Sequence, residues 1–403
     1  MKLKVDSIRR LYEILLFIVM LLGSGTPWQN IYNQQIIFGF FALSVLYFLI
    51  FSKHTLYKRA VSVTLIILAL LFAAMLVNLD FDLSHYGGLA LVIVAAMLLA
   101  SSMPHERFCA LYINIMVIVA IYSSVITVYS NIVPSFAGTL PELQSGSLSW
   151  HHIGIFYNYW GWTQWTSFIR NSACFREPGV WGCYASLALM MLFLGTDGSA
   201  DGNGSGRNPK RYYRIKVVSL ILGIVLSVST TAIICLGLCL MLYFVKGEKM
   251  VDKKRLALFF LAILGVGYVV NYYGERLFAK LNPDSTDYVS FADRWEGIAS
   301  GWSSFVADPI FGSGYTTYLA ENTGTSANAF VDTLGKYGLF FAAAVFMGLL
   351  FWIMKASNRY LERVIIGLIF LVMLGTQSLL LMPTLLTVCF YGYKSGNFYM
   401  NQT

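Results

Sequence analysis

The chain contains 403 residues, of which 57% are hydrophobic and 12% are charged, with a formal net charge of +8. Soluble domains carry roughly 25% charged residues, so this composition excludes a soluble globular protein, and its hydrophobicity excludes a disordered chain. Unbroken apolar runs such as 61–79 also argue against a membrane β-barrel, whose strands alternate apolar and polar residues. What remains is a polytopic membrane protein built from helices.

Twelve apolar segments approach the roughly 20 residues that a membrane-spanning helix needs. They are 11–25, 36–51, 61–79, 87–103, 108–129, 177–195, 217–229, 231–245, 256–272, 328–354, 364–376 and 378–393. Polar residues at 227 and 229–231 interrupt the stretch 217–245, so we predict two short helices with a polar apex there. We expect an all-α polytopic membrane protein with about 12 transmembrane helices, and 10 or 11 remain alternatives.

Lysine and arginine gather in every second loop, whereas the intervening loops 26–35 and 80–86 are uncharged or acidic. The positive-inside rule then predicts that both termini are cytoplasmic. No single basic block suggests a nucleic-acid partner. The predicted order is five spans in 1–129, an outer loop 130–176, four spans in 177–272 with a cytoplasmic linker 196–216, an outer loop 273–327, and three spans in 328–403.

The first outer loop ends in a charged group just before the sixth span. Arg170, Arg176 and Glu177 precede Pro178, which suits the first turn of a helix and leaves Glu177 near the helix N-terminus. Two arginines on the outer side oppose the usual charge bias. We interpret the group as an anion site beside a carboxylate, and the alternative is a helix-capping set that snorkels to the interface.

The second outer loop combines charge, aromatic residues and glycines. Asp293, Arg294 and Trp295 begin a stretch in which large apolar side chains recur at helical spacing: Trp295, Ile298, Trp302 and Phe305. This spacing predicts an amphipathic helix along the membrane surface or over a cavity. Segment 308–314 (DPIFGSG) predicts a turn.

The tenth span opens with Asn328, Asp332 and Lys336, which share one helix face because they lie four residues apart. Ionisable groups at membrane depth usually face a bundle interior or a wet cavity. We expect a polar wall for a sugar-like ligand, and a structural Asp332–Lys336 pair is the alternative.

Segment 150–165 is rich in tryptophan and contains His151 and His152. Its aromatic rings suit either an interfacial belt or stacking on sugar rings. The two adjacent histidines have no further ligands at metal spacing, so we predict no metal site.

Four segments together resemble a family, the bacterial O-antigen polymerases (the Wzy type) within the O-antigen polymerase/ligase superfamily. Segment 170–179 is similar to the family's R…F-x-E-P-G start of a span, and 227–231 resembles its polar apex. Segment 294–314 looks like its R…P-x-x-G-x-G loop, and 328–339 is similar to its H-N…G-L span start. The resemblance covers the whole architecture and implies a GT-C-like fold.

One departure separates two branches of the superfamily. Ligases carry a catalytic histidine just before that asparagine, whereas this chain has Ala327. The ligases' S-R apex is also absent, because Thr230 follows Ser229. These differences favour a polymerase over a ligase.

The resemblance implies an inverting, metal-independent glycosyl transfer without cofactors on the periplasmic face of the bacterial inner membrane. An oligosaccharide chain on undecaprenyl pyrophosphate is transferred to another lipid-linked repeat unit. The implied partners are these donor and acceptor lipids, membrane lipid and a chain-length regulator protein. A flippase for lipid-linked saccharides is a rival from another class, but it needs polar groups through the bilayer midplane.

Arginine forms forked contacts with phosphate and stays charged, so we expect Arg170 and Arg294 to stabilise the departing pyrophosphate. Glu177 is the candidate general base. Asp293, Asp332 and His151 are alternatives, as is loss of the proton without a dedicated base. The expected substrate-binding residues are Arg176, Asp293, Asn328, Asp332, Lys336, Trp295 and His151.

Overall fold

The structure is a computed structural model that describes residues 2–52, 56–145, 148–155, 157–160, 168–195, 209–246, 288–322 and 328–394. The predicted ninth span (256–272) and most of the predicted linker 196–216 lie outside these residues.

Long apolar helices dominate the described residues, as the composition predicts. They begin with α1 (Lys2–Leu22), α2 (Pro27–Phe51), α3 (Lys58–Val77), α4 (Leu83–Ser102) and α5 (His105–Ile132). The later ones are α7 (Pro178–Phe193), α8 (Pro209–Leu226), α9 (Thr230–Val245), α13 (Ala329–Ala356), α14 (Tyr360–Thr376) and α15 (Pro383–Tyr393). A helix satisfies its own backbone, which a lipid environment requires.

Five of these helices are long and apolar enough to cross a membrane, namely α2, α3, α4, α5 and α13. Helices α7 and α9 are apolar but shorter, with 16 residues each. The chain is therefore consistent with an all-α membrane protein, and the total of 12 spans stays a prediction. The predicted polar apex is confirmed, because α8 ends at Leu226 and α9 begins at Thr230.

The first outer loop is not all helical, which corrects the all-α expectation locally. After the short helix α6 (Pro134–Gly138), strands β1 (Glu142–Ser145), β2 (Leu148–Ile153) and β3 (Tyr157–Trp160) form an antiparallel sheet in the order β1-β2-β3. Aromatic residues favour strands because they pack on neighbouring strands. In this sheet Trp150 lies opposite Trp160.

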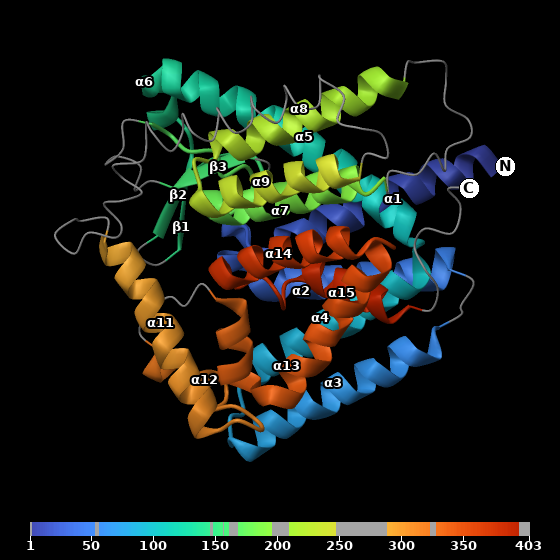
Figure 1. Cartoon of the computed structure of the whole chain (residues 1–403), viewed down its shortest axis with the longest axis vertical. Helices are drawn as coiled ribbons and strands as arrows, with labels where there is room; N and C mark the ends of the chain where they lie inside the picture. The colour runs from blue at the N-terminus through green and yellow to red at the C-terminus, as the bar shows by residue number, and fades with distance from the viewer. Residues whose placement is uncertain are drawn as a thin grey trace.

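The two ends of the helix bundle carry different elements (Figure 1). The sheet and helix α11 (Tyr288–Ala307) lie at the left end of the bundle, and the N-terminus lies at the right end. Helix α7 packs against α5, α8 and α9, and nearly all of its side chains are buried. Its N-terminus, which carries Glu177, therefore has a fixed position in the bundle.

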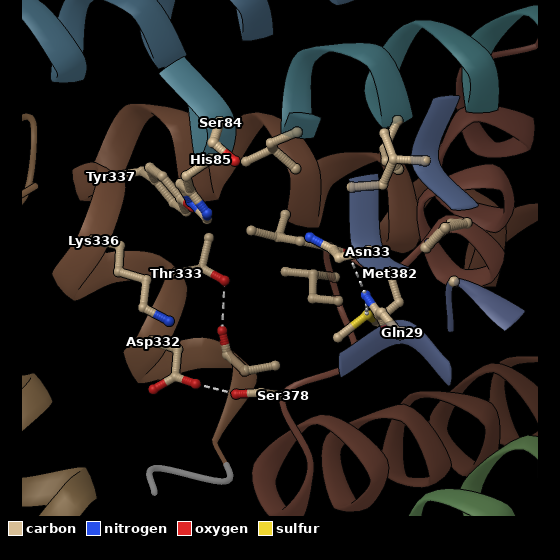
Figure 2. A pocket seen from close by; sticks show the side chains of 18 residues that line it. Gln29, Asn33, Ser84, His85, Asp332, Thr333, Lys336, Tyr337, Ser378 and Met382 are labelled. Carbon is tan, nitrogen blue, oxygen red and sulfur yellow. Dashed lines mark hydrogen bonds between the residues drawn. The ribbon is translucent and has the colours of Figure 1, made fainter. Parts of the chain in front are cut away.

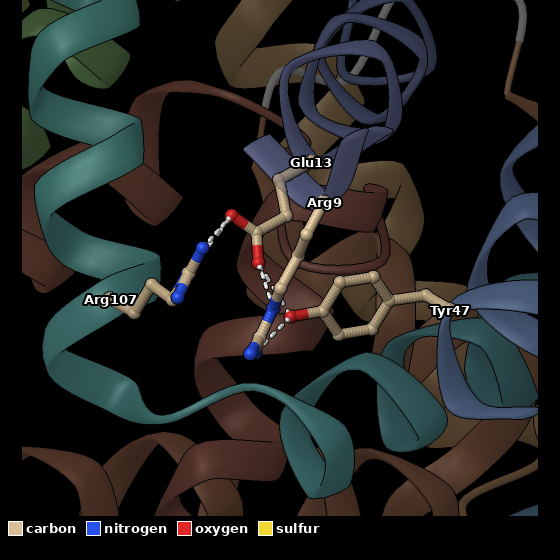
Figure 3. Close-up of polar contacts among 4 residues, drawn as sticks. All are labelled: Arg9, Glu13, Tyr47 and Arg107. Atoms are coloured by element: carbon tan, nitrogen blue, oxygen red, sulfur yellow. Dashed lines mark hydrogen bonds and ion pairs between the residues drawn. The ribbon is translucent and has the colours of Figure 1, made fainter. Parts of the chain in front are cut away.

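A buried ionic cluster joins α1, α2 and α5 (Figure 3). The fully buried Glu13 carboxylate pairs with Arg9 Nε at 3.1 Å and with Arg107 Nη2 at 2.7 Å. The Tyr47 hydroxyl donates to Glu13 Oε1 at 2.7 Å and accepts from Arg9 Nη2 at 3.0 Å. We call these four residues the Glu13 cluster.

Candidate functional site: a polar cavity at the start of helix α13

Helix α13 is broken near its start, and the predicted turn 308–314 fills the break. Gly338 has φ 77° and ψ −179°, so the helical hydrogen bond from Leu339 N to Gly335 O is not made. Instead Leu339 N donates to Pro309 O at 2.8 Å, and Ser313 N donates to Gly335 O at 2.8 Å. The turn thereby satisfies the backbone groups that the break exposes.

Glycine is required where the turn 308–314 packs against the break in α13, for two reasons. Residues with a Cβ rarely adopt the positive φ of Gly338. A Cβ there would also lie 2.1 Å from Ile310 O, and one at Gly312 would lie 2.6 Å from Gly335 O. The glycines of segments 308–314 and 328–339 therefore allow the turn and the start of α13 to pack directly against each other.

Asp332 lies within the first turns of α13, and the protein occupies both of its carboxylate oxygens. The Tyr318 hydroxyl donates to Oδ1 at 2.8 Å, and the Ser378 hydroxyl donates to Oδ2. Tyr318 belongs to helix α12 (Tyr315–Glu321) and reaches Asp332 by passing between Gly301 and Gly335, where a Cβ would lie 2.5 Å or less from the tyrosine. Asp332 is thus a firmly held, buried group.

Lys336 lies one helical turn beyond Asp332, and its charge rests on aromatic rings. Its Nζ is 5.0 Å from the ring centre of Tyr318 and 5.9 Å from that of Tyr315. Both are cation–π distances. Among the described residues, the ion pairs within 4.0 Å do not include one between Lys336 and Asp332, so the alternative of a structural pair is not found.

Both residues line a cavity of about 230 Å³ that is enclosed by α2, α4, α13 and the segment before α15 (Figure 2). Its polar lining residues are Gln29, Asn33, Ser84, His85, Asp332, Thr333, Lys336, Tyr337 and Ser378. Apolar residues such as Ile37, Leu89 and Met382 complete the wall. Asn328 is not among the lining residues, because its side chain caps α13 by accepting from Phe330 N and Val331 N.

His85 is a member of the site that the sequence did not predict. Its ring stacks on that of Tyr315 with centres 3.4 Å apart, and its Nε2 lies 2.5 Å from the Tyr337 hydroxyl. The available signal was a lone histidine at the predicted outer end of an apolar span. Tyr315 and Tyr337, which contact its ring, lie more than 200 positions away in the sequence, so no local motif indicated a site at His85.

Asp80 holds helix α12 over the cavity. Its carboxylate accepts from Thr316 N at 2.9 Å, from the Thr316 hydroxyl and from the Tyr86 hydroxyl at 3.1 Å. Burial alone would raise the pKa of Asp80, but the hydrogen bonds from Thr316 and Tyr86 outweigh it and hold the pKa below its ordinary value of 3.8. Asp80 is therefore ionised at neutral pH.

The predicted anion site at the start of α7 adjoins the helix apex. Arg170 donates from Nε to Ser227 O at 3.1 Å and from Nη2 to Val228 O at 2.9 Å. These bonds satisfy carbonyl groups after the end of α8 and join the motif 170–179 to the motif 227–231. The guanidinium plane is thereby held in one orientation.

Glu177 is the N-cap residue of α7, and Pro178 occupies the first turn as predicted. Its side chain makes no cap hydrogen bond, and none of the described ion pairs includes it. The neighbouring Arg176 is fixed through its backbone, because its N–H donates to Gly25 O and its carbonyl accepts from Trp150 Nε1, both at 2.9 Å. Buried Trp150 thus ties the sheet to this corner.

One short segment before α15 links the cavity to the start of α7, where Arg176 and Glu177 lie. A Cβ on Gly179 would lie 2.6 Å from Gln377 Nε2 and 3.7 Å from Ser229 Oγ. The residue after Gln377 is Ser378, which donates to Asp332. The first turn of α7 is therefore linked to Asp332 through Gln377 and Ser378.

Three other predicted site residues lie elsewhere or are only partly described. His151 sits in the sheet with Nδ1 3.2 Å from Leu140 O. Helix α11 is confirmed and exposes Trp295, whereas the side chains of Asp293 and Arg294 lie outside the described residues. Ala327 lies outside them as well.

Comparison with known proteins gives one match. Residues 215–340 match the family model described as O-antigen ligase, which spans α8, α9, α11, α12 and the start of α13. Searches of curated proteins and of solved structures found no match. The matched segment contains Asp332, Lys336 and the turn 308–314, whereas Arg170, Glu177 and His85 lie before it. Over this segment, which is less than half of the chain, the sequence is similar to the O-antigen ligase family.

Proposed function

We propose that the protein is a polysaccharide polymerase. It transfers an oligosaccharide chain from undecaprenyl pyrophosphate to another lipid-linked repeat unit. The observation that carries the proposal is the cavity at the start of α13, where Lys336 and Asp332 lie inside the segment that matches the family. Ala327, which stands where the resembling ligases have histidine, favours a polymerase over a ligase.

In the proposed reaction, a hydroxyl oxygen of the acceptor sugar attacks the anomeric carbon of the donor. The new glycosidic bond forms as the bond from that carbon to the pyrophosphate oxygen breaks, so the configuration inverts. Negative charge grows on the leaving pyrophosphate. Fixed positive groups that face this charge stabilise the transition state without reorganising.

Arg170 and Arg294 are the proposed stabilising groups. The two bonds from Arg170 to Ser227 O and Val228 O support the role of Arg170, because they fix its guanidinium orientation before substrate arrives. Arg294 lies on α11 at the same end of the bundle as the sheet. Guanidinium groups provide planar, paired donors to phosphate oxygens.

Glu177 is the proposed general base that takes the proton of the acceptor hydroxyl. It is the N-cap residue of α7, directly before Pro178 in the first turn of the helix. A carboxylate without a cap hydrogen bond can accept a proton without first losing a structural contact. Asp332 suits this role less well, because both its oxygens accept hydrogen bonds from the protein.

The proposed setting is the periplasmic face of the bacterial inner membrane, with cytoplasmic termini. The sheet and α11 lie at the end of the bundle opposite the N-terminus, which supports an outward-facing site. The carrier lipids would reach it within the membrane, and a chain-length regulator is the proposed protein partner.

A surface-polysaccharide gel of a deletion strain tests the function. Wild-type protein should restore a ladder of repeats, and Arg294→Ala should restore a single repeat. Arg10→Ala is the matched control, because Arg10 is an exposed arginine on α1, outside the residues proposed for the site. Polymer that accumulates on carrier lipid in the deletion strain would indicate a ligase instead, and surface glycan without any repeat would indicate a flippase.

A further inference from the structure

A second hollow lies on the outside of the helix pair α2 and α4. This groove of about 670 Å³ is walled mainly by Ile37, Phe38, Leu83, Gly87, Gly88 and Leu91. Phe38 is 64% exposed and Leu83 is 70% exposed, although both are large and apolar. The groove lies in the first half of both α2 and α4, and since both are candidate membrane spans we expect it to face lipid near one surface of the membrane. We call it the α2/α4 groove.

The groove is wide because glycines form part of its floor. A Cβ added to Gly87 would meet no atom within 4 Å, and one added to Gly88 would meet only Ile37 Cδ1 at 3.4 Å. A larger residue at position 87 would therefore fill the groove without displacing the protein. Substitution of Gly87 by a larger residue is therefore a direct way to block the α2/α4 groove.

The groove and the polar cavity adjoin each other. Ile37 and Ser84 line both of them. At this junction Gln34 Nε2 donates to Ser84 Oγ at 2.8 Å. A ligand that occupied both spaces would have an apolar part against α2 and α4 and a polar part inside the bundle.

The cavity offers positive charge to the polar part. Both oxygens of Asp332 already accept hydrogen bonds, whereas no carboxylate of the described residues is ion-paired with Lys336. The amides of Gln29 and Asn33 add further donors to the lining. Asp332 is the nearest carboxylate to this half-buried ammonium, but it lies beyond ion-pair distance, so an anionic ligand group would find an ammonium that no described carboxylate contacts directly.

We propose that the α2/α4 groove and the Lys336 cavity form one binding site for a prenyl-pyrophosphate lipid. The prenyl chain lies in the groove, the pyrophosphate lies beside Lys336, and the lipid enters sideways from the membrane between α2 and α4. This inference rests on the proposed function, which uses two lipid-linked substrates and so needs two anion sites. The second proposed anion site is the region around Arg170 and Glu177, before and at the start of α7.

Photolabelling of the purified full-length protein in nanodiscs tests this site. The probe is a prenyl pyrophosphate with a diazirine in its chain, and labelled peptides are mapped by mass spectrometry. Label should fall on α2 and α4, and unlabelled prenyl pyrophosphate should displace it whereas excess phosphatidylglycerol should not. Lys336→Gln should weaken displacement by the unlabelled pyrophosphate roughly tenfold or more, because a charge-assisted contact is lost.

Gly87→Leu should remove most of the label, and Gly367→Leu is the matched control. Gly367 lies on α14, and a Cβ there also meets no atom within 4 Å. If Gly87→Leu fails to fold, Phe38→Gln offers a second test, because Phe38 is exposed in the groove wall.

Label on other helices, equal displacement by phosphatidylglycerol, or full labelling of a folded Gly87→Leu protein would overturn the inference. The gel reports separately on the proposed function. Expected labelling in a protein that restores no ladder would retain the lipid site and reject the polymerase.

Discussion

Two groups of ionisable side chains lie inside this helical protein, and they differ in whether the protein pairs their charges. In the Glu13 cluster, one buried carboxylate receives two arginines and a tyrosine hydroxyl (Figure 3). In the cavity, the Lys336 ammonium lies 5.0 Å and 5.9 Å from the ring centres of Tyr318 and Tyr315. Figure 2 shows it beside Asp332 in the cavity wall. The first group is complete without a ligand, whereas the second has positive charge to offer.

Whether a charged side chain is paired by the protein distinguishes a structural ionic cluster from a candidate functional site better than the burial of that side chain does. Ionisable residues at membrane depth are costly and therefore suggest a functional site by default. The Glu13 cluster shows that the cost can also be met by full pairing, in which case the group holds helices together. The following predictions would break or sharpen the comparison, beginning with the largest expected effect.

Removing the charge of Glu13 should destabilise the protein without altering its chemistry. Glu13→Gln leaves Arg9 and Arg107 without a counter-ion, and breaking a buried pair costs about 3–5 kcal/mol. Thermal unfolding in detergent should show a clear fall in midpoint. The control is Glu106→Gln, an exposed carboxylate on α5, and an equal midpoint for both variants would contradict the structural role.

Adding one methyl group at the break in α13 should disturb the fit between the turn and the helix. Gly338→Ala brings a Cβ within 2.1 Å of Ile310 O at positive φ, which should cost about 2–4 kcal/mol from overpacking and backbone strain. Unfolding midpoints measure the effect. Gly237→Ala, where a Cβ meets nothing within 4 Å, should leave the midpoint nearly unchanged.

Replacing Lys336 should reduce turnover more than stability. A hydrogen bond to a charged group contributes about 1.5–3 kcal/mol, so Lys336→Gln should lower kcat/KM roughly 10- to 150-fold in an assay with lipid-linked repeats. Lys336→Arg keeps the charge and should retain part of the activity. Unchanged kcat/KM in Lys336→Gln would remove the cavity from the reaction.

The smallest expected effect concerns Asp80 and pH. Since its pKa in the folded protein lies below 3.8, its stabilising contribution is present above about pH 4 and is lost as pH falls through the folded-state pKa. The difference in unfolding midpoint between wild type and Asp80→Asn should therefore be constant from pH 5 to 8 and shrink in more acidic buffer. A difference that grew on acidification would contradict this assignment.

Much of the helical layout was predictable, because apolar runs and polar interruptions are local signals. Predicted spans such as 61–79 and 108–129 agree with α3 and α5 to within a few residues. The sheet was missed because its short strands occur in a loop whose aromatic residues suited an interfacial belt equally well. Trp150 shows the difference, since it is buried and bonds to Arg176 O.

The site was only half predictable for a related reason. Asp332 and Lys336 share a helix face, so their spacing indicated a common wall. His85, Gln29 and Asn33 reach that wall from α4 and α2, and only tertiary packing reveals it. Likewise the glycines of 308–314 indicated a turn, but their fit against Gly335 and Gly338 required the structure.

The central claim is that the Lys336 cavity is functional and the Glu13 cluster is structural. The most direct measurement is a surface-polysaccharide gel of the deletion strain carrying Lys336→Gln or Glu13→Gln, with the amount of membrane-inserted protein matched between them. Glu13→Gln should restore a ladder of repeats and Lys336→Gln should leave a single repeat. A full ladder from Lys336→Gln at equal protein level would contradict the claim.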